Sequence, residues 1–195
     1  MKYLKTYKTL NESLSEVFTA AVEDDMKSFK DFIALLNNVY SVDNNGDDLL
    51  YHTIVNDDYE KTKYLLDNFD WNINKELKDS YNFNLYINAA FDVNNEKIVK
   101  SLYKYKNFDI KKQEAINGSL LLEIWNLFGV DLTIDFLNTF PDYDWKTKNI
   151  IGKDFYEDLD DGIYYDDIEV LAKNVNNKEL KNHLNKIIKA KEFNL

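Results

Sequence analysis

The chain has 195 residues, of which 45% are apolar and 15% aromatic, which is enough to fill a core and argues against disorder. One proline and five glycines are too few turn signals for an all-β sandwich or barrel, and the absence of cysteine excludes disulfides, zinc ribbons and thiol nucleophiles. The net charge of −11, with no arginine, argues against nucleic-acid binding, because an acidic surface repels phosphate. We therefore expect a mostly helical protein.

The N-terminal segment, residues 1–14, mixes three lysines with isolated apolar residues. It contains no continuous apolar run of the kind found in signal peptides, and no later run approaches the length of a membrane span. We therefore expect a cytoplasmic protein that does not bind membranes.

The predicted helices come in pairs. In chain order the pairs are 17–23 with 28–36, 48–56 with a helix that ends at 66, 85–91 with 96–105, and 120–127 with 132–137. Corresponding positions in the first helices are Ala20, Thr53, Ala89 and Trp125, which are 33, 36 and 36 residues apart. This spacing is typical of proteins built from helix–turn–helix repeats. A generic helical bundle is the alternative interpretation.

The clearest repeat, residues 43–74, resembles the ankyrin repeat family. Asp43 and Gly46 match the turn aspartate and glycine of that family, and Leu50 matches the leucine of its Thr-Pro-Leu-His motif. Asp57 takes the place of the glycine between the two helices, and Leu65-Leu66 matches the double leucine of the second helix. The departures are considerable, since residues 48–51 read Asp-Leu-Leu-Tyr and Trp125 replaces an alanine.

The resemblance implies an all-α, ankyrin-like helical-repeat solenoid of about four to five helix pairs with a C-terminal capping helix. The predicted units are about 13–42, 43–78, 79–112 and 113–146, followed by 147–195, all in a single domain. Asn177 is expected to cap the last helix, which places Leu180, Leu184, Ile187 and Ile188 on one face.

The sequence contains no pattern that predicts catalysis. Its two histidines, His52 and His183, fall in different units, and no glycine-rich loop is present to bind phosphate. The acidic segment 157–169 does not fit a calcium-binding EF-hand loop, because placing Gly162 at the sixth position puts Leu159 at a ligand position. We therefore expect no enzyme activity, no cofactor and no metal.

The segment 154–169 is the strongest candidate for partner binding. Half of its residues are acidic, none is lysine, and Phe155, Tyr156, Tyr164 and Tyr165 are interleaved with the acids. Such a run is equally typical of a solvated face, but carboxylates beside tyrosines also suit the docking of a basic protein. This character resembles the binding surfaces of bacterial immunity proteins that neutralise nuclease toxins. The candidate residues are Asp154, Tyr156, Glu157, Asp158, Asp160, Asp161, Tyr164, Tyr165, Asp166 and Asp167.

The ankyrin resemblance implies a second candidate surface, because the turns and first helices of that family line a concave binding face. The residues it is expected to expose include Asp43, Asn45, Asp47 and Tyr81. Polar residues at these positions are equally what any loop contains.

Together these features predict a protein-binding module that is a monomer on its own. The first hypothesis is an acidic inhibitor or immunity-type protein that binds and occludes a basic toxin or nuclease. The alternative is a scaffold or effector that binds a host or regulatory protein through the concave face.

Overall fold

The computed structural model of the protein describes residues 14–75, 85–112, 119–148, 152, 154–155 and 165–193. Across these ranges the regular structure is helical, with one isolated antiparallel bridge between Val42 and Asp48. The expected all-α class is therefore confirmed for this part of the chain. The same ranges contain no helix long and apolar enough to cross a membrane.

The chain divides into two compact units, Met1–Phe108 and Asp109–Leu195, which are described separately. The single-domain organisation stays a prediction.

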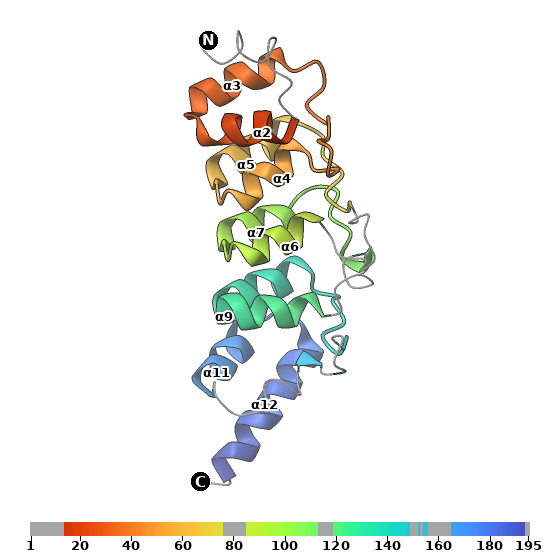
Figure 1. Cartoon of the computed structure of the whole chain (residues 1–195). Coiled ribbons are helices and arrows are strands. Elements are labelled where there is room, and N and C mark those ends of the chain that lie inside the picture. The colour runs from red at the N-terminus through yellow and green to blue at the C-terminus, as the bar shows by residue number, and fades with distance from the viewer. Residues whose placement is uncertain are drawn as a thin grey trace. The chain divides into compact units, whose positions relative to one another are not determined.

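In the described ranges of the first unit the helices form three consecutive pairs (Figure 1). The pairs are α2 (Leu14–Glu23) with α3 (Met26–Leu35), α4 (Leu49–Val55) with α5 (Tyr59–Asn68), and α6 (Leu85–Asp92) with α7 (Glu96–Tyr103). The first helices pack in series, α2 on α4 and α4 on α6, and α5 packs on α7. The helices thus lie where the sequence predicts them, within a few residues at each end.

Each second helix of this unit begins at a side-chain cap. The capping residues are Asp25, Asp58 and Asn95, and each accepts a hydrogen bond from the amide three residues further on, at 2.8, 2.9 and 3.1 Å. Such caps satisfy amide groups that have no partner inside the helix. The short polar corners between the paired helices therefore fix where the second helices start.

Two of these corners require a left-handed backbone. Asp57 has a φ of 56° and Asn94 a φ of 52°, and each directly precedes a capping residue. Aspartate and asparagine tolerate this conformation better than other side chains, although glycine adopts it most easily. This explains how Asp57 can stand where the ankyrin resemblance implies a glycine.

Replacing Asn94 with glycine is expected to raise the free energy of unfolding by about 0.5–1 kcal/mol, because glycine has no Cβ to oppose a positive φ. Asp57→Gly is expected to gain less, since Asp57 Oδ1 accepts a 2.5 Å hydrogen bond from Asn95 Nδ2 that glycine cannot replace. Urea denaturation followed by circular dichroism measures both changes. A loss of stability in Asn94→Gly would contradict this account of the corner.

The extended tail after α5 joins successive pairs through hydrogen bonds. The contacts are Asp70 N to Tyr40 Oη at 3.1 Å, Tyr105 Oη to Phe69 O at 2.8 Å, and Asn74 Nδ2 to Asn107 O at 2.6 Å. These partners lie 30, 36 and 33 residues apart in the chain. The values are close to the repeat spacing seen in the sequence, so equivalent segments of neighbouring pairs lie in register.

The second unit contains α9 (Leu120–Thr139), α11 (Tyr165–Asn174) and α12 (Lys178–Phe193). Gly129, with φ 74° and ψ −161°, interrupts α9 in a region of backbone space open almost only to glycine. The two segments of α9 correspond to the predicted pair 120–127 and 132–137. Helix α11 packs on both α9 and α12.

The C-terminal helix α12 begins where the sequence predicts. Asn177 Oδ1 accepts a 2.9 Å hydrogen bond from the amide of Leu180, which confirms the predicted cap. Leu180, Leu184 and Ile187 are buried, whereas Ile188 is only partly covered. The apolar face of the helix is therefore used in packing.

Candidate protein-binding surface

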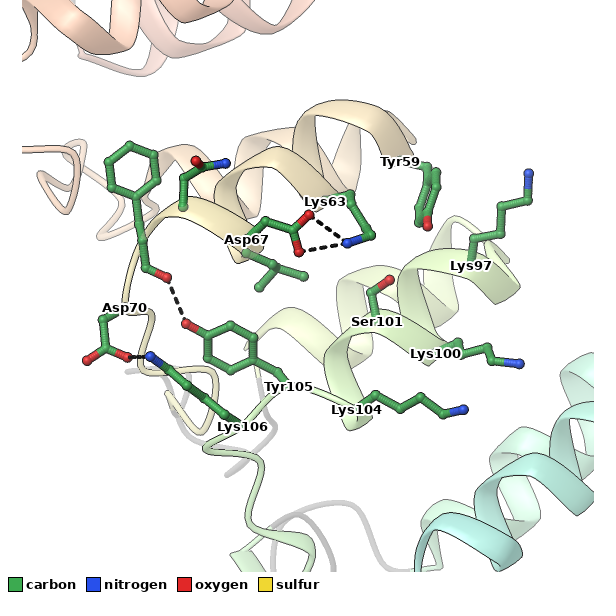
Figure 2. Close-up of a pocket in the computed structure, with 13 residues that line it drawn as sticks. Tyr59, Lys63, Asp67, Asp70, Lys97, Lys100, Ser101, Lys104, Tyr105 and Lys106 are labelled. Atoms are coloured by element: carbon green, nitrogen blue, oxygen red, sulfur yellow. Dashed lines mark hydrogen bonds and ion pairs between the residues drawn. The ribbon is translucent and has the colours of Figure 1, made fainter.

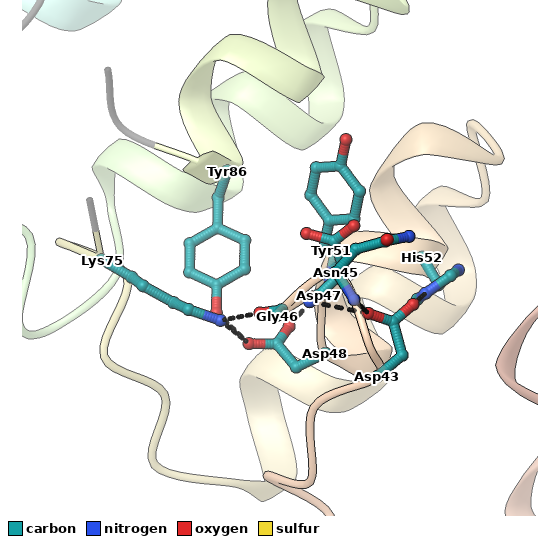
Figure 3. Close-up of polar contacts among 9 residues, drawn as sticks. All are labelled: Asp43, Asn45, Gly46, Asp47, Asp48, Tyr51, His52, Lys75 and Tyr86. Carbon is teal, nitrogen blue, oxygen red and sulfur yellow. Dashed lines mark hydrogen bonds and ion pairs between the residues drawn. The ribbon is translucent and has the colours of Figure 1, made fainter. Parts of the chain in front are cut away.

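The turn between the first and second pairs is built around the Asp43 carboxylate (Figure 3). Its Oδ1 accepts hydrogen bonds from the amides of Asn45 and Asp47, at 2.8 and 3.0 Å. Gly46, with a φ of 89°, closes the turn by donating to the carbonyl of Asp43. The Asp43 side chain has an exposure of 0%, so it acts inside the turn. The expectation that Asp43 is exposed for partner binding is therefore wrong.

His52 connects this turn to the helices behind it. Its Nε2 lies 3.1 Å from Asp43 Oδ2, and its ring packs edge-on against Phe18 of α2 at 5.5 Å between centroids. The histidine thus contacts the turn on one side and the core of the preceding pair on the other. This arrangement gives His52 a structural role.

Asp43 is expected to make stability dependent on pH. Burial acts to raise the pKa of its carboxyl, but hydrogen bonds from the amides of Asp47 and Asn45 and from His52 outweigh burial and lower that pKa. A lowered pKa stabilises the fold fully above the unfolded value of about 3.9, and this stabilisation is lost as the pH falls through the folded pKa.

Asp43→Asn is therefore expected to lower the free energy of unfolding by about 1–2 kcal/mol at pH 5, because charged hydrogen bonds become neutral ones. The difference from the wild type should be smaller at about pH 3, because the stabilisation is lost as the pH falls through the lowered folded pKa of Asp43. Urea denaturation at both pH values measures it. A difference that stayed constant over this range would show that the charge of Asp43 is not what stabilises the turn.

Asp48 ties the same turn to the following pair. Its Oδ1 accepts from the amide of Tyr51 at 3.1 Å and so caps α4. Its Oδ2 accepts from Lys75 Nζ at 3.0 Å and from Tyr86 Oη at 2.6 Å. Lys75 Nζ also donates to the carbonyl of Gly46 at 2.9 Å. Burial, and next the negative charge of Asp48, raise the pKa of Tyr86, so this tyrosine stays a neutral donor.

The outward side of the turn and the adjoining helices form the acidic tyrosine surface, which we define as Asn45, Asp47, Tyr51 and Asp92. Asn45 and Asp92 are exposed, and Asp47 and Tyr51 are half-buried. Burial and then the charge of Asp43 raise the pKa of Asp47. Burial, followed by the charges of Asp47 and Asp92, raises the pKa of Tyr51. The Tyr51 phenol therefore lies in a negative field beside the hydrogen-bonded turn.

This surface coincides only in part with the residues singled out in the sequence. Asn45 and Asp47 belong to it, whereas Tyr81 lies outside the described residues. Sequence reasoning missed Tyr51 and Asp92. Tyr51 occupies the histidine position of the family motif, and that departure was the available signal.

The acidic segment of the second unit is described only at its ends. Asp154 is half-buried, and Asp166 and Asp167 lie in the first turn of α11, where carboxylates interact favourably with the positive end of the helix dipole. Tyr165 begins α11. Tyr156, Glu157, Asp158, Asp160, Asp161 and Tyr164 lie outside the described residues.

Phe155 does not belong to a docking surface. Its side chain is fully buried and packs edge-on against Trp125, at 5.5 Å between ring centroids. The interpretation that it alternates with the acids on a surface is therefore wrong. Among the residues that the structure describes, no group of three or more histidine, aspartate or glutamate side chains is placed to hold a metal ion.

The fold of this chain resembles that of a protein of known structure. No protein-family model and no curated protein matches the sequence. A chain from the solved complex of Bd0816, a predatory endopeptidase from Bdellovibrio bacteriovorus, with immunity protein Bd3460 is similar in structure, with a TM-score of 0.53. The similarity covers 85% of this chain and 78% of that chain at 21% sequence identity. At this identity the likeness shows a shared fold.

Proposed function

We propose that this chain is an immunity-type protein, which binds a toxin protein and blocks its active site without catalysis of its own. The observation that carries the proposal is the structural likeness over 85% of the chain, because the neighbour is an immunity protein in complex with an endopeptidase. The acidic tyrosine surface supports it by supplying an exposed binding face.

The fold that serves this function is, in our proposal, a single ankyrin-like solenoid that is monomeric before it binds. Three features of the first unit support this arrangement: successive packing of first helices, left-handed corners at Asp57 and Asn94, and tail hydrogen bonds 30–36 residues apart. A stacked array presents its turns along one edge, and several turns then contact one partner.

The proposed partner is a basic toxin enzyme. A protein with a net charge of −11 attracts a positively charged partner over long range, and complementary charges raise the association rate. Tyr51 contributes a large, stiff contact with a hydroxyl group, the type of residue that often dominates interface energies. The acidic segment 154–169 is proposed as a second contact region.

Affinity capture from the lysate of the source cells tests the proposal. We expect the tagged chain to retain one basic protein at about 50 mM salt and to lose much of it at about 500 mM, where charges are screened within a few ångströms. Less of the partner should be captured, and the capture should depend less on salt, when asparagine replaces Asp160, Asp161, Asp166 and Asp167. Mass spectrometry identifies and quantifies the retained protein.

Two results would contradict the proposed role of charge in partner binding. Unchanged capture by the fourfold variant would remove the acidic segment 154–169 from the interface. A neutral partner that survives high salt would instead favour the scaffold or effector alternative, because its binding would not depend on charge.

A further inference from the structure

The outward face of α4 carries an apolar stripe, which we define as Tyr51 and Val55. The two residues are four positions apart, so their side chains lie on the same face of the helix, about 6 Å apart along its axis. Tyr51 is half-buried, and Val55 is 41% exposed. The other side of the helix faces the core and consists of Leu49, Leu50, Thr53 and Ile54.

A carboxylate flanks this α4 stripe at each end of the helix. Helices α4 and α6 pack against each other, and Val55 and Asp92 are their last residues. The corners that follow these helices are joined by the hydrogen bond from Asn95 Nδ2 to Asp57 Oδ1, so the two C-terminal ends lie side by side. Asp47 lies at the other end of α4, in the turn that precedes it. The stripe is thus apolar in its centre and acidic at its edges.

The charges of Asp47 and Asp92 are available to a partner. Within the described ranges neither carboxylate forms an ion pair with a lysine. Asp92 also stands at the C-terminal end of α6, which has no basic residue in its last turn, and a carboxylate there opposes the helix dipole. The negative charge of Asp92 therefore does not stabilise its own helix, whereas it would attract a cation from outside.

The second helices of the first unit differ in this respect. Asp67 and Asp70 line a groove of about 740 Å³ formed by α5, α7 and the segments that follow them (Figure 2). Lys63 Nζ contacts Asp67 Oδ2 at 2.6 Å, and Lys106 Nζ contacts Asp70 Oδ1 at 2.9 Å. Because these carboxylates are already paired with cations, charge complementarity favours the first helices as the docking side for a basic partner.

We propose that the α4 stripe binds a basic amphipathic helix of the partner, an inference that rests on the proposed function for the partner's identity as a toxin. Residues three or four apart in such a helix lie about 5–6 Å apart on one face, which matches the spacing of Tyr51 and Val55. An aliphatic side chain of the partner packs on Val55, and the stem of a lysine or arginine one turn away packs on the Tyr51 ring. The cation at the end of that stem then lies in the field of Asp47 and Asp92.

The test uses the full chain and a dye-labelled, alanine-rich helical peptide of about 18 residues that places leucine and lysine four residues apart on one face. The control peptide has the same composition and charge, but its leucines and lysines lie on opposite faces. Fluorescence anisotropy at about 100 mM salt measures the affinity of the chain for each peptide.

One substitution places a cation in the stripe, and a second serves as its matched control. The first is Val55→Lys. The control is Leu35→Lys, because Leu35 is also exposed, is also the last residue of its helix, and lies on α3, a second helix. Both variants change the net charge of the chain by the same amount, so a difference between them reports the site of the charge.

We expect the wild type and Leu35→Lys to bind the amphipathic peptide with similar affinity, and at least about fivefold more tightly than the control peptide. Val55→Lys is expected to bind it at least about tenfold more weakly, because the change removes an apolar contact and repels the lysines of the peptide. Circular dichroism checks that both variants are folded. Equal affinity for the two peptides, an equal loss in both variants, or no binding to the wild type would overturn the proposal.

Affinity capture from the lysate separates this inference from the proposed function. If the wild-type chain captures no toxin, the immunity function fails, and the peptide measurements still decide whether the stripe takes a basic helix. If the wild type, Val55→Lys and Leu35→Lys all capture the toxin equally, the function stands and the α4 stripe is not the docking site.

Discussion

Replacing Asp48 with alanine is expected to lower the free energy of unfolding by about 3 kcal/mol. The Asp48 carboxylate caps α4 and accepts from both Lys75 and Tyr86, and its side chain is only 6% exposed. Loss of the cap costs about 1 kcal/mol, and the remainder comes from leaving the buried Tyr86 hydroxyl and the half-buried ammonium of Lys75 without this acceptor. Urea denaturation at pH 7, followed by circular dichroism, measures the change.

Two variants show whether this loss of stability comes from the hydrogen-bonded network around Asp48 or only from the loss of a negative charge. Asp67→Ala removes an exposed ion pair with Lys63 and is expected to cost less than about 1 kcal/mol. Tyr86→Phe removes only one of the contacts to Asp48 and is expected to cost about 1–2 kcal/mol. If Asp48→Ala and Asp67→Ala lost equal stability, Asp48 would not link the two pairs as described.

Replacing Tyr51 with alanine is expected to weaken binding of the captured partner by about 10–100-fold, because tyrosines that become buried when an interface forms are frequent hot spots. The double change Asp47→Asn, Asp92→Asn is expected to slow association by about threefold at low salt. It is expected to have little effect on the association rate at high salt, where the charges are screened. Surface plasmon resonance with the purified partner separates the association rate from the dissociation rate.

The matched control for the double change is Asp31→Asn, Glu60→Asn, which removes the same charge from exposed positions of α3 and α5. It is expected to leave the rates nearly unchanged, because these residues lie on second helices. Should the control pair slow association as much as the double change does, net charge and not the acidic tyrosine surface would steer the partner.

The helix pairs could be predicted from the sequence because short polar signals fix their ends. Asp25, Asp58 and Asn95 each stand between the two predicted helices of a pair, and each caps the second helix. A local signal of this kind needs no knowledge of the rest of the fold. Trp125, an unusual residue for its repeat position, packs against Phe155 from a segment that sequence reasoning assigned to the surface.

The candidate site was less predictable, because it depends on contacts between distant residues. Nothing in the local sequence shows that the carboxylate of Asp43 turns inward onto His52, since an outward orientation would fit the same turn. Asp48 meets Lys75 and Tyr86 across 27 and 38 residues, respectively. Burial and long-range pairing thus decide which turn residues support the fold and which remain exposed.

Growth of cells that express the captured partner tests most directly whether this chain protects cells by blocking a toxin. We predict that the partner alone arrests growth, that co-expression of the wild-type chain restores it, and that the Tyr51→Ala chain, although folded, restores it poorly. A partner that is harmless alone, or growth arrest that the wild-type chain does not relieve, would contradict the immunity function.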